Sequence, residues 1–163
     1  PMGSPREDLL GTVLADRYEL TQIIGEGGMG TVFRGHQLGV GRDVAIKILN
    51  PVAADDYEHV TGLFFREARA ICQLSHPNTI RLFDFGRTSE NELYITMELV
   101  TGDSLSNLIR SGGLSLFDAV HIGQALAEAL MEAHDQGIIH RDIKPSNIVL
   151  LWPFYEQSST ESW

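Results

Sequence analysis

The chain has 163 residues, of which 43% are hydrophobic and 21% charged, and its formal net charge is −10. These values are typical of a globular protein with one domain or two small lobes, and they exclude a disordered or collagen-like chain. The acidic balance argues against a nucleic-acid or anionic-membrane partner, because proteins that bind these partners carry basic surfaces. The single cysteine, Cys72, excludes an intrachain disulfide framework.

Neither a membrane span nor a leader peptide is predicted. No stretch approaches the ~20 consecutive apolar residues of a membrane helix, and no charged-then-apolar leader opens the chain. We therefore expect a cytoplasmic protein that makes no membrane contact. Residues 1–4 resemble a cloning or protease scar, and residues 1–16 are interpreted as this scar and an N-terminal extension.

The first half of the chain contains short runs in which apolar and polar residues alternate as they do in strands. Runs at residues 17–24, 31–36 and 42–49 are separated by glycine-rich turns and predict three consecutive antiparallel strands. Two further strands are predicted at residues 80–85 and 92–99. These runs predict a five-stranded antiparallel sheet.

Helical spacing of apolar residues appears once between these strands and twice after them. It predicts a helix over residues 57–74, a short helix over 104–110 and a long helix over 115–136. The expected fold is α+β, with the sheet and one helix in a small lobe and a partial helical lobe after it. The predicted boundaries are 17–98 for the small lobe, 99–103 for a hinge, 104–151 for the partial helical lobe and 152–163 for a tail without a recognised motif.

The first chemical signal is the glycine-rich run Gly25-Glu26-Gly27-Gly28-Met29-Gly30. A dinucleotide-binding fingerprint requires a helix after the last glycine, and a Walker A loop requires Gly-Lys-Ser/Thr; this run has neither. A glycine-rich hairpin between two strands remains, and its backbone N–H groups can approach phosphate oxygens closely. The alternative is a plain flexible turn.

Two further signals follow along the chain. Lys47 ends the run Val44-Ala45-Ile46-Lys47 on the third predicted strand, where a lone lysine is usually an exposed edge residue. Glu67 is expected to face inward from the helix over 57–74, where it can pair with Lys47 and hold it against phosphates. The last signal is His140-Arg141-Asp142-Ile143-Lys144-Pro145-Ser146-Asn147.

In this order, these motifs resemble those of the bacterial eukaryotic-like (Hanks-type) Ser/Thr protein kinases, over about residues 18–150. The last motif matches the H-R-D-x-K-P-x-N loop of that family in full, and a lysine two positions after the aspartate is the pattern of its Ser/Thr group. The resemblance implies a transferase that uses ATP and Mg²⁺ and phosphorylates Ser or Thr hydroxyls of a protein substrate.

The resemblance also implies a role for each matched residue. Lys47 would contact the α- and β-phosphates, oriented by Glu67. Asp142 would accept the proton of the substrate hydroxyl, Lys144 would steady the γ-phosphate, and Asn147 would ligate one Mg²⁺. The implied nucleotide-binding positions are Gly25, Gly27 and Gly30 over the phosphates, Val32, Ala45 and Val149 around the adenine, Met97 as gatekeeper, and Glu98 to Val100 as backbone hydrogen-bonding partners.

The resemblance stops at about residue 151. The next landmark of the family is an Asp-Phe-Gly whose aspartate carries the principal Mg²⁺, but Asp84-Phe85-Gly86 precedes the His-Arg-Asp loop and lies in a predicted strand. No aspartate follows Asn147, and the activation segment and the rest of the helical lobe are missing. A neutral amide is a poor sole anchor for a hard dication, so we expect weak Mg²⁺ binding and weak or absent phosphoryl transfer by this chain alone.

The helix predicted over 115–136 is apolar almost all round, which favours burial on every side. Because the chain can cover only one side, we expect the other side to pair with a second copy or to be covered by Trp152, Phe154, Tyr155 and Trp163.

Three functions stay open: a kinase that obtains its missing metal ligand from a partner, an ATP-binding pseudokinase-like module, and a self-associating module with a vestigial nucleotide pocket.

Overall fold

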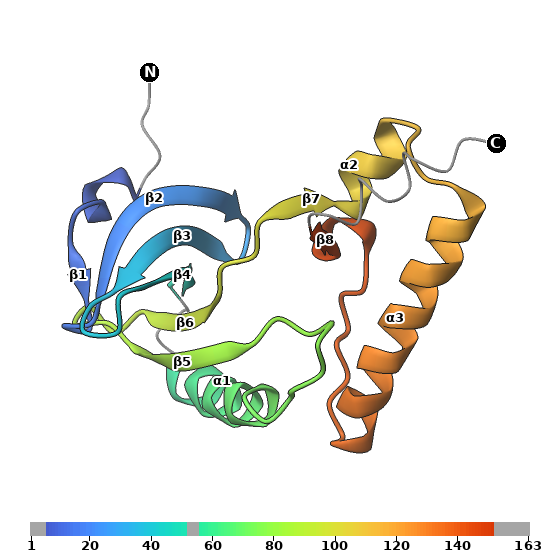
Figure 1. The fold of residues 1–163 in the computed structure, drawn as a ribbon. Coiled ribbons are helices and arrows are strands. Elements are labelled where there is room, and N and C mark those ends of the chain that lie inside the picture. The colour runs from blue at the N-terminus through green and yellow to red at the C-terminus, as the bar shows by residue number, and fades with distance from the viewer. Residues whose placement is uncertain (1–5, 52–55, 152–163) are drawn as a thin grey trace. The chain divides into compact units, whose positions relative to one another are not determined.

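The computed structural model describes residues 6–51 and 56–151 (Figure 1). The chain divides into two compact units. The sheet unit comprises the chain up to Gln73 together with Ile80–Leu99, and the helical unit comprises Leu74–Thr79 together with the chain from Val100 onward. The interpretations placed on residues 1–4 and on the aromatic residues of the tail lie outside the described residues.

Among the described residues, the sheet unit contains one six-stranded sheet in the order β1-β2-β3-β4-β6-β5. Every neighbouring pair is antiparallel. The five predicted strands are confirmed, with small shifts at their ends, and β1 was not predicted. The strands are β1 (Val13–Leu14), β2 (Tyr18–Gly27), β3 (Gly30–Gln37), β4 (Arg42–Leu49), β5 (Leu82–Arg87) and β6 (Leu93–Glu98).

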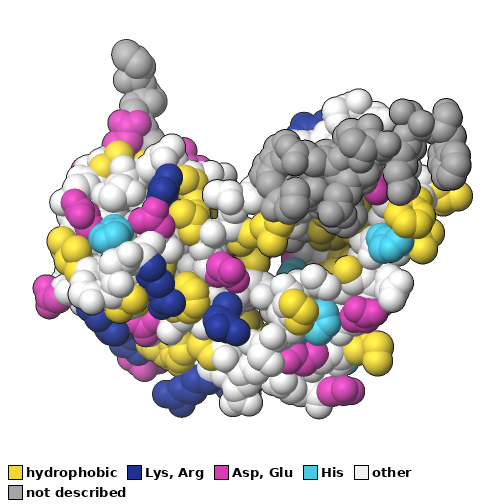
Figure 2. Space-filling view, in the orientation of Figure 1, with side chains coloured by type: hydrophobic (Ala, Val, Ile, Leu, Met, Phe, Trp, Pro, Cys, Tyr) yellow, Lys and Arg dark blue, Asp and Glu magenta, His cyan; other side chains and the backbone are white. Residues whose placement is uncertain are grey.

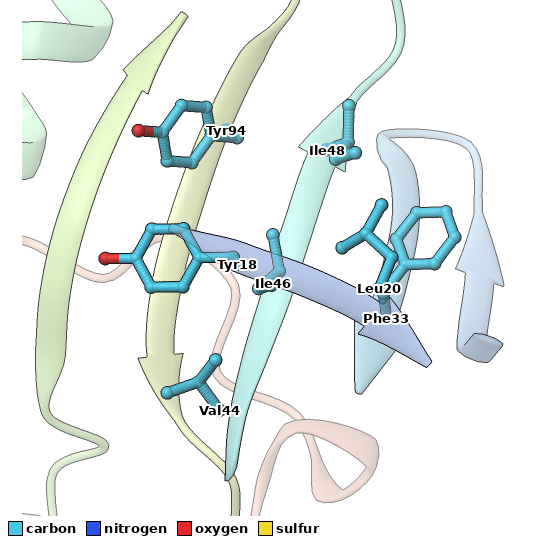
Figure 3. Close-up of a cluster of buried hydrophobic side chains, with 7 residues drawn as sticks. All are labelled: Tyr18, Leu20, Phe33, Val44, Ile46, Ile48 and Tyr94. Carbon is cyan, nitrogen blue, oxygen red and sulfur yellow. The ribbon is translucent and has the colours of Figure 1, made fainter. Parts of the chain in front are cut away.

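One face of the sheet carries the core of this unit (Figure 3). Side chains alternate between the two faces of a strand, so every second residue of the central strands points into this cluster. Each member is at most 2% exposed, which makes this cluster the main apolar contribution to stability in the sheet unit. The cluster consists of Tyr18 and Leu20 of β2, Phe33 of β3, Val44, Ile46 and Ile48 of β4, and Tyr94 of β6.

The segment before β2 is part of this fold. A 3-10 turn at Glu7–Leu9 and the short strand β1 precede it, and Leu9 and Leu14 pack against the core cluster. The described part of this N-terminal extension therefore packs onto the core of the sheet unit. Two residues are too few to show the period of a strand, so the pairing of β1 with β2 leaves no pattern in the sequence.

Helix α1 (Tyr57–Ile71) packs beside β5 (Figure 1). The rings of Phe64 and Phe65 lie 6.5 and 5.7 Å from the ring of Phe85, measured between centroids. Phe85 pairs with Ile95, and Ile95 pairs with Lys47 of β4. Directly paired residues share a face, so α1 packs on the face that carries Lys47, opposite the core cluster.

The helical unit contains α2 (Leu105–Arg110) and α3 (Leu116–Asp135), as predicted within one residue at each end. Ser104 caps α2 through its hydroxyl, and Ser115 and Asp118 form a reciprocal capping box at the start of α3. A small core joins these helices to β8 (Val149–Leu151), the segment after the His-Arg-Asp loop (residues 140–147). It consists of Leu105, Leu108, Ile122 and Leu150.

Two short strands of the helical unit were not predicted. β7 (Gly102–Ser104) pairs with β8 (Val149–Leu151) in an antiparallel ladder. Gly102 is required here, because a Cβ at this position would lie 2.1 Å from the carbonyl oxygen of Leu150. Two residues of the ladder, Gly102 and Asp103, belong to the segment interpreted as a hinge, and Ser104 pairs with the predicted adenine contact Val149.

The loop Leu74–Thr79 is held to α3 by one carboxylate. The Ser75 N–H lies 3.1 and 3.2 Å from the two Glu132 carboxylate oxygens, the Ser75 hydroxyl donates to Oε1 at 3.1 Å, and the His76 N–H donates to Oε2 at 2.9 Å. The hydrogen bond from the Ser75 backbone holds the pKa of Glu132 below its usual range. This carboxylate therefore stays ionised and fixes the loop.

One face of α3 is apolar and exposed. Leu116, Phe117, Val120 and Met131 are 83%, 69%, 62% and 65% exposed. Figure 2 shows hydrophobic side chains at the surface of the region where Figure 1 draws α3. Among the described residues, no helix is both long enough and apolar enough to cross a membrane.

Candidate active site

The glycine-rich run forms the hairpin between β2 and β3, in which Gly25 pairs with Val32 and Gly27 pairs with Gly30. Its glycines differ in what surrounds them. Gly30 has a φ of +149°, and a Cβ there would lie 2.2 Å from the carbonyl oxygen of Ile48. A Cβ on Gly27 or Gly28 would meet nothing within 4 Å. Packing therefore requires a glycine only at position 30, and the turn at 27–28 is open to a ligand.

Strand pairing gathers the predicted adenine and phosphate residues of the sheet unit on one face. Lys47 pairs with Val32, and Ala45 pairs with Met97. Lys47 and Ala45 are two positions apart on β4, so they share a face, and that face is opposite the core cluster of Figure 3. Lys47 is half-buried there. This arrangement provides an apolar surface with one ammonium group beside the glycine hairpin.

The predicted pair between Lys47 and Glu67 is not formed in this structure. Both residues are described, and no ion pair within 4.0 Å joins them. The reason is the rotation of α1: Thr61 and Ala68 are buried, and Glu67 lies about 100° round the helix axis from Ala68 on an exposed side. The expectation that Glu67 faces inward is therefore wrong for this structure.

Asp84 of the early Asp-Phe-Gly run has a structural role in β5. Its carboxylate accepts a hydrogen bond from the Tyr18 hydroxyl at 2.9 Å and lies 3.1 Å from the Arg17 guanidinium. Asp84 also pairs with Thr96, which places it on the core face and away from Lys47. Burial, together with the Asp84 hydrogen bond, raises the pKa of Tyr18 to about 12. The prediction that this aspartate belongs to a strand is confirmed.

Two side chains of the His-Arg-Asp loop in the helical unit converge on one carboxylate. The Asn147 amide donates to Asp142 Oδ2 and to the Asp142 carbonyl, both at 2.9 Å, and Lys144 Nζ lies 2.9 Å from Oδ2. Arg141 adopts a left-handed conformation with a φ of 63°, which turns the chain just before Asp142. The Lys144 ammonium and the Asn147 amide hold the pKa of Asp142 below its usual range. An ionised carboxylate at this position can accept a proton, and the ammonium beside it can contact an anionic ligand.

The described residues do not fit a complete Mg²⁺ site. The amide nitrogen of Asn147 donates to Asp142. The only atom of the Asn147 side chain that could ligate a metal ion is therefore its neutral carbonyl oxygen. Within residues 6–51 and 56–151, no group of three His, Cys, Asp or Glu side chains could hold a metal ion. Mg²⁺ requires octahedral oxygen coordination with carboxylate anchors, which this set does not supply.

The N–H of Glu98, at the end of β6, is used within the sheet unit. It donates to the Arg81 carbonyl at 2.9 Å. The backbone hydrogen bonds from Glu98 to Val100 toward adenine stay a prediction.

A model of the protein kinase domain matches residues 18–152. The chain belongs to the protein kinase family. Among curated relatives, it is 39% identical to the serine/threonine-protein kinase pkn3 of Myxococcus xanthus over 145 residues. It is 38% identical to the serine/threonine-protein kinase PknA of Mycobacterium tuberculosis over 152 residues. These relatives bear out the predicted bacterial Ser/Thr kinase lineage.

A solved structure supports the same fold for this kinase chain. The PknI kinase domain of Mycobacterium tuberculosis matches with a TM-score of 0.76 and 29% sequence identity, over 86% of this chain and 56% of that one. The match to pkn3 covers 88% of this chain but 26% of pkn3. The match to PknA covers 90% of this chain but 34% of PknA. This chain therefore spans about a quarter to a third of the length of these relatives.

Sequence motifs did not indicate two residues that hold loops of this chain in place. Asn50, just after β4, contacts the glycine hairpin, and Glu132 holds the loop Leu74–Thr79. Neither belongs to a motif that names a chemical role. Residues 75–78 contain a proline, which is typical of the end of a helix, but this gives no indication of the partner carboxylate on α3.

Proposed function

We propose that this kinase chain is the ATP-binding and base-carrying part of a Ser/Thr protein kinase. The observation that carries the proposal is the convergence of Lys144 and Asn147 on the Asp142 carboxylate, in a chain that matches the protein kinase domain. The face with Val32, Ala45, Lys47 and Met97 supports a nucleotide site. A hinge at 99–103, contacts from Val100 and Val149, and a cytoplasmic location are part of the same proposal.

The proposed reaction moves the γ-phosphoryl group of ATP to a protein hydroxyl. The substrate oxygen forms a bond to the γ-phosphorus, the bond to the bridging oxygen breaks, and ADP leaves. Asp142 accepts the hydroxyl proton, and Lys144 stabilises the negative charge of the transferred group. Mg²⁺, when bound, supplies charge neutralisation on the phosphates, and Asn147 is the residue here that would contribute to holding it.

We further propose that these 163 residues bind ATP but transfer phosphate weakly or not at all. Within them, no aspartate follows Asn147, and Glu67 does not reach Lys47. Phosphoryl transfer depends mainly on electrostatic stabilisation of the transferred group, so the loss of a metal anchor removes the main source of rate.

Calorimetry with ATP tests the binding part of this proposal. The unchanged chain is expected to bind ATP, and Lys47→Ala is expected to weaken binding at least ~10-fold, because Lys47 is half-buried and pairs with Val32 beside the glycine hairpin. Titrations with and without Mg²⁺ separate metal-dependent from metal-independent binding. Equal affinities for the two proteins would overturn the assigned role of Lys47, and no binding by the unchanged chain would overturn the nucleotide site.

Transfer of labelled γ-phosphate tests the activity part. We expect incorporation by the unchanged chain to equal that of Asp142→Asn, which keeps the shape of the side chain but removes the base. Incorporation clearly above this control would show that the chain is an active kinase by itself.

Self-association through α3 is a second candidate function, favoured by the exposed apolar residues on that helix. In this alternative, the nucleotide pocket is vestigial or binds ATP without turnover, as in a pseudokinase. Sedimentation measurements of mass against concentration distinguish this alternative from a monomeric ATP-binding protein.

A further inference from the structure

Asn50, directly after β4, makes two hydrogen bonds to the turn of the glycine hairpin. The Asn50 side-chain amide donates to the Gly28 carbonyl at 2.9 Å, and the Asn50 N–H donates to the Met29 carbonyl at 3.1 Å. Gly28 and Met29 are exposed, and a Cβ on Gly28 would meet nothing within 4 Å. Side-chain packing therefore leaves Gly28 unrestrained, and Asn50 supplies a side-chain restraint.

The end of β4 that carries Asn50 is itself held by an N-terminal arginine. Arg6 Nη2 donates to the Leu49 carbonyl at 3.2 Å and to Glu92 Oε1 at 2.8 Å. The side chains of Arg6 and Glu92 are only 12% and 17% exposed. A mostly buried ion pair loses much of its solvation, so removing either partner is costly, and the pair fixes the backbone that it contacts. Arg6 lies outside the residues that match the protein kinase domain.

We propose that Asn50 is a positioning residue for the phosphates of ATP, and that Arg6 supports it through Leu49. Asn50 holds the carbonyls of Gly28 and Met29 toward β4, which limits the conformations of the turn above the proposed phosphate site. Ligand binding costs less when the binding loop is already restrained, because less conformational freedom is then lost. This inference rests on the proposed function, since it assumes that the hairpin covers phosphates.

The position of Asn50 makes the expected effect selective. Asn50 contacts the turn of the hairpin and none of the proposed adenine residues. We expect Asn50→Ala to weaken ATP binding about fivefold, which equals about 1 kcal/mol and is the usual size of one hydrogen bond. Adenosine, which has no phosphates, is expected to bind both proteins equally.

The test is calorimetry with ATP and with adenosine on the unchanged chain, Asn50→Ala and Gln73→Ala. Gln73→Ala removes an exposed amide from the same unit and is expected to change neither affinity. A general loss of folded structure would weaken both ligands together. An ATP-to-adenosine affinity ratio that stays the same in Asn50→Ala would overturn the proposal.

Hydrogen exchange separates failure of this inference from failure of the proposed function. In nucleotide-free protein, Asn50→Ala is expected to speed exchange in the hairpin turn at residues 27–30, and Gln73→Ala is not. If the unchanged chain binds no ATP, the proposed function fails, and faster exchange in Asn50→Ala still supports the restraint. Unchanged exchange together with an unchanged affinity ratio rejects the role of Asn50.

A double-mutant cycle tests the role of Arg6. If Arg6 acts through Asn50, Arg6→Ala lowers the ATP-to-adenosine ratio in the unchanged chain but lowers it less in Asn50→Ala. Additive effects would show that Arg6 acts on ATP binding by another route. Thermal unfolding of each variant measures the stability lost with the Arg6–Glu92 pair. A loss of folded protein weakens the binding of ATP and of adenosine equally, because both ligands require the same folded unit. It therefore cancels in the ratio of the two affinities.

Discussion

Gly30 and Gly28 lie two residues apart in the same hairpin, yet they face different physical constraints. A Cβ on Gly30 would lie 2.2 Å from a backbone oxygen of β4, and β4 belongs to the core and cannot move away cheaply. A Cβ on Gly28 meets open space. The glycine motif of this kinase therefore combines one residue fixed by packing with others that leave room for a ligand.

This difference predicts that two alanine substitutions change the free energy of unfolding by different amounts. Gly30→Ala is expected to lower the free energy of unfolding by at least ~2 kcal/mol, through backbone strain and the clash with Ile48. Gly28→Ala is expected to change it by less than ~0.5 kcal/mol. Urea unfolding followed by circular dichroism measures both. Equal midpoints for the two variants would contradict the assigned packing role of Gly30.

Single residues also show where motif-based prediction succeeds and fails. The family resemblance named Asp142, Lys144 and Asn147, and these lie within hydrogen-bonding distance because they come from one short loop. The resemblance also paired Lys47 with Glu67, which come from a strand and a separate helix. Their distance depends on the rotation of α1 about its axis, and no local pattern determines that rotation in advance.

At the level of elements, α3 buries one side and exposes the other. Ile122, Ala129 and Ala133 are buried, whereas Leu116, Val120 and Met131 are exposed. Exposed side chains of this size in one helix are unusual for a monomer and are typical of an interaction surface. The periodicity of the sequence predicted the helix, but an almost uniformly apolar helix carries no signal for which side is covered.

The exposed side of α3 gives a test of self-association with a closely matched control. Val120 on α3 and Val40 in the turn between β3 and β4 are 62% and 63% exposed. If α3 pairs with a second copy, Val120→Glu is expected to weaken the dimer at least ~10-fold, because it places charges in an apolar interface. Val40→Glu adds the same charge elsewhere and is expected to have no effect. Sedimentation equilibrium measures both, and identical masses for the two variants would argue against this interface.

Strands of ordinary length were predicted, and the very short ones were not. The five long strands of the sheet have six or more residues each, which is long enough for a sequence pattern to reveal them. β1, β7 and β8 have two or three residues each. They exist because a partner strand lies beside them: β7 pairs with β8, from which it is separated by the whole of α2, α3 and the His-Arg-Asp loop. Such pairings depend on the folded chain and leave little local trace.

At the scale of the whole molecule, the two units are not consecutive pieces of the chain. The backbone passes from one unit to the other between Gln73 and Leu74, returns between Thr79 and Ile80, and crosses again between Leu99 and Val100. The sequence predicted only the last of these crossings, because the loop after α1 looks like an ordinary helix stop. Its membership of the helical unit follows from contacts with α3.

This threading limits how the protein can be divided. A fragment cut at the predicted hinge would carry α3 without the loop Leu74–Thr79, and the Glu132 carboxylate would lose the Ser75 and His76 donors that hold it. The complementary fragment would keep this loop, between α1 and β5, without the Glu132 carboxylate that binds it. A division of this chain that preserves the contact therefore has to keep the loop Leu74–Thr79 together with α3.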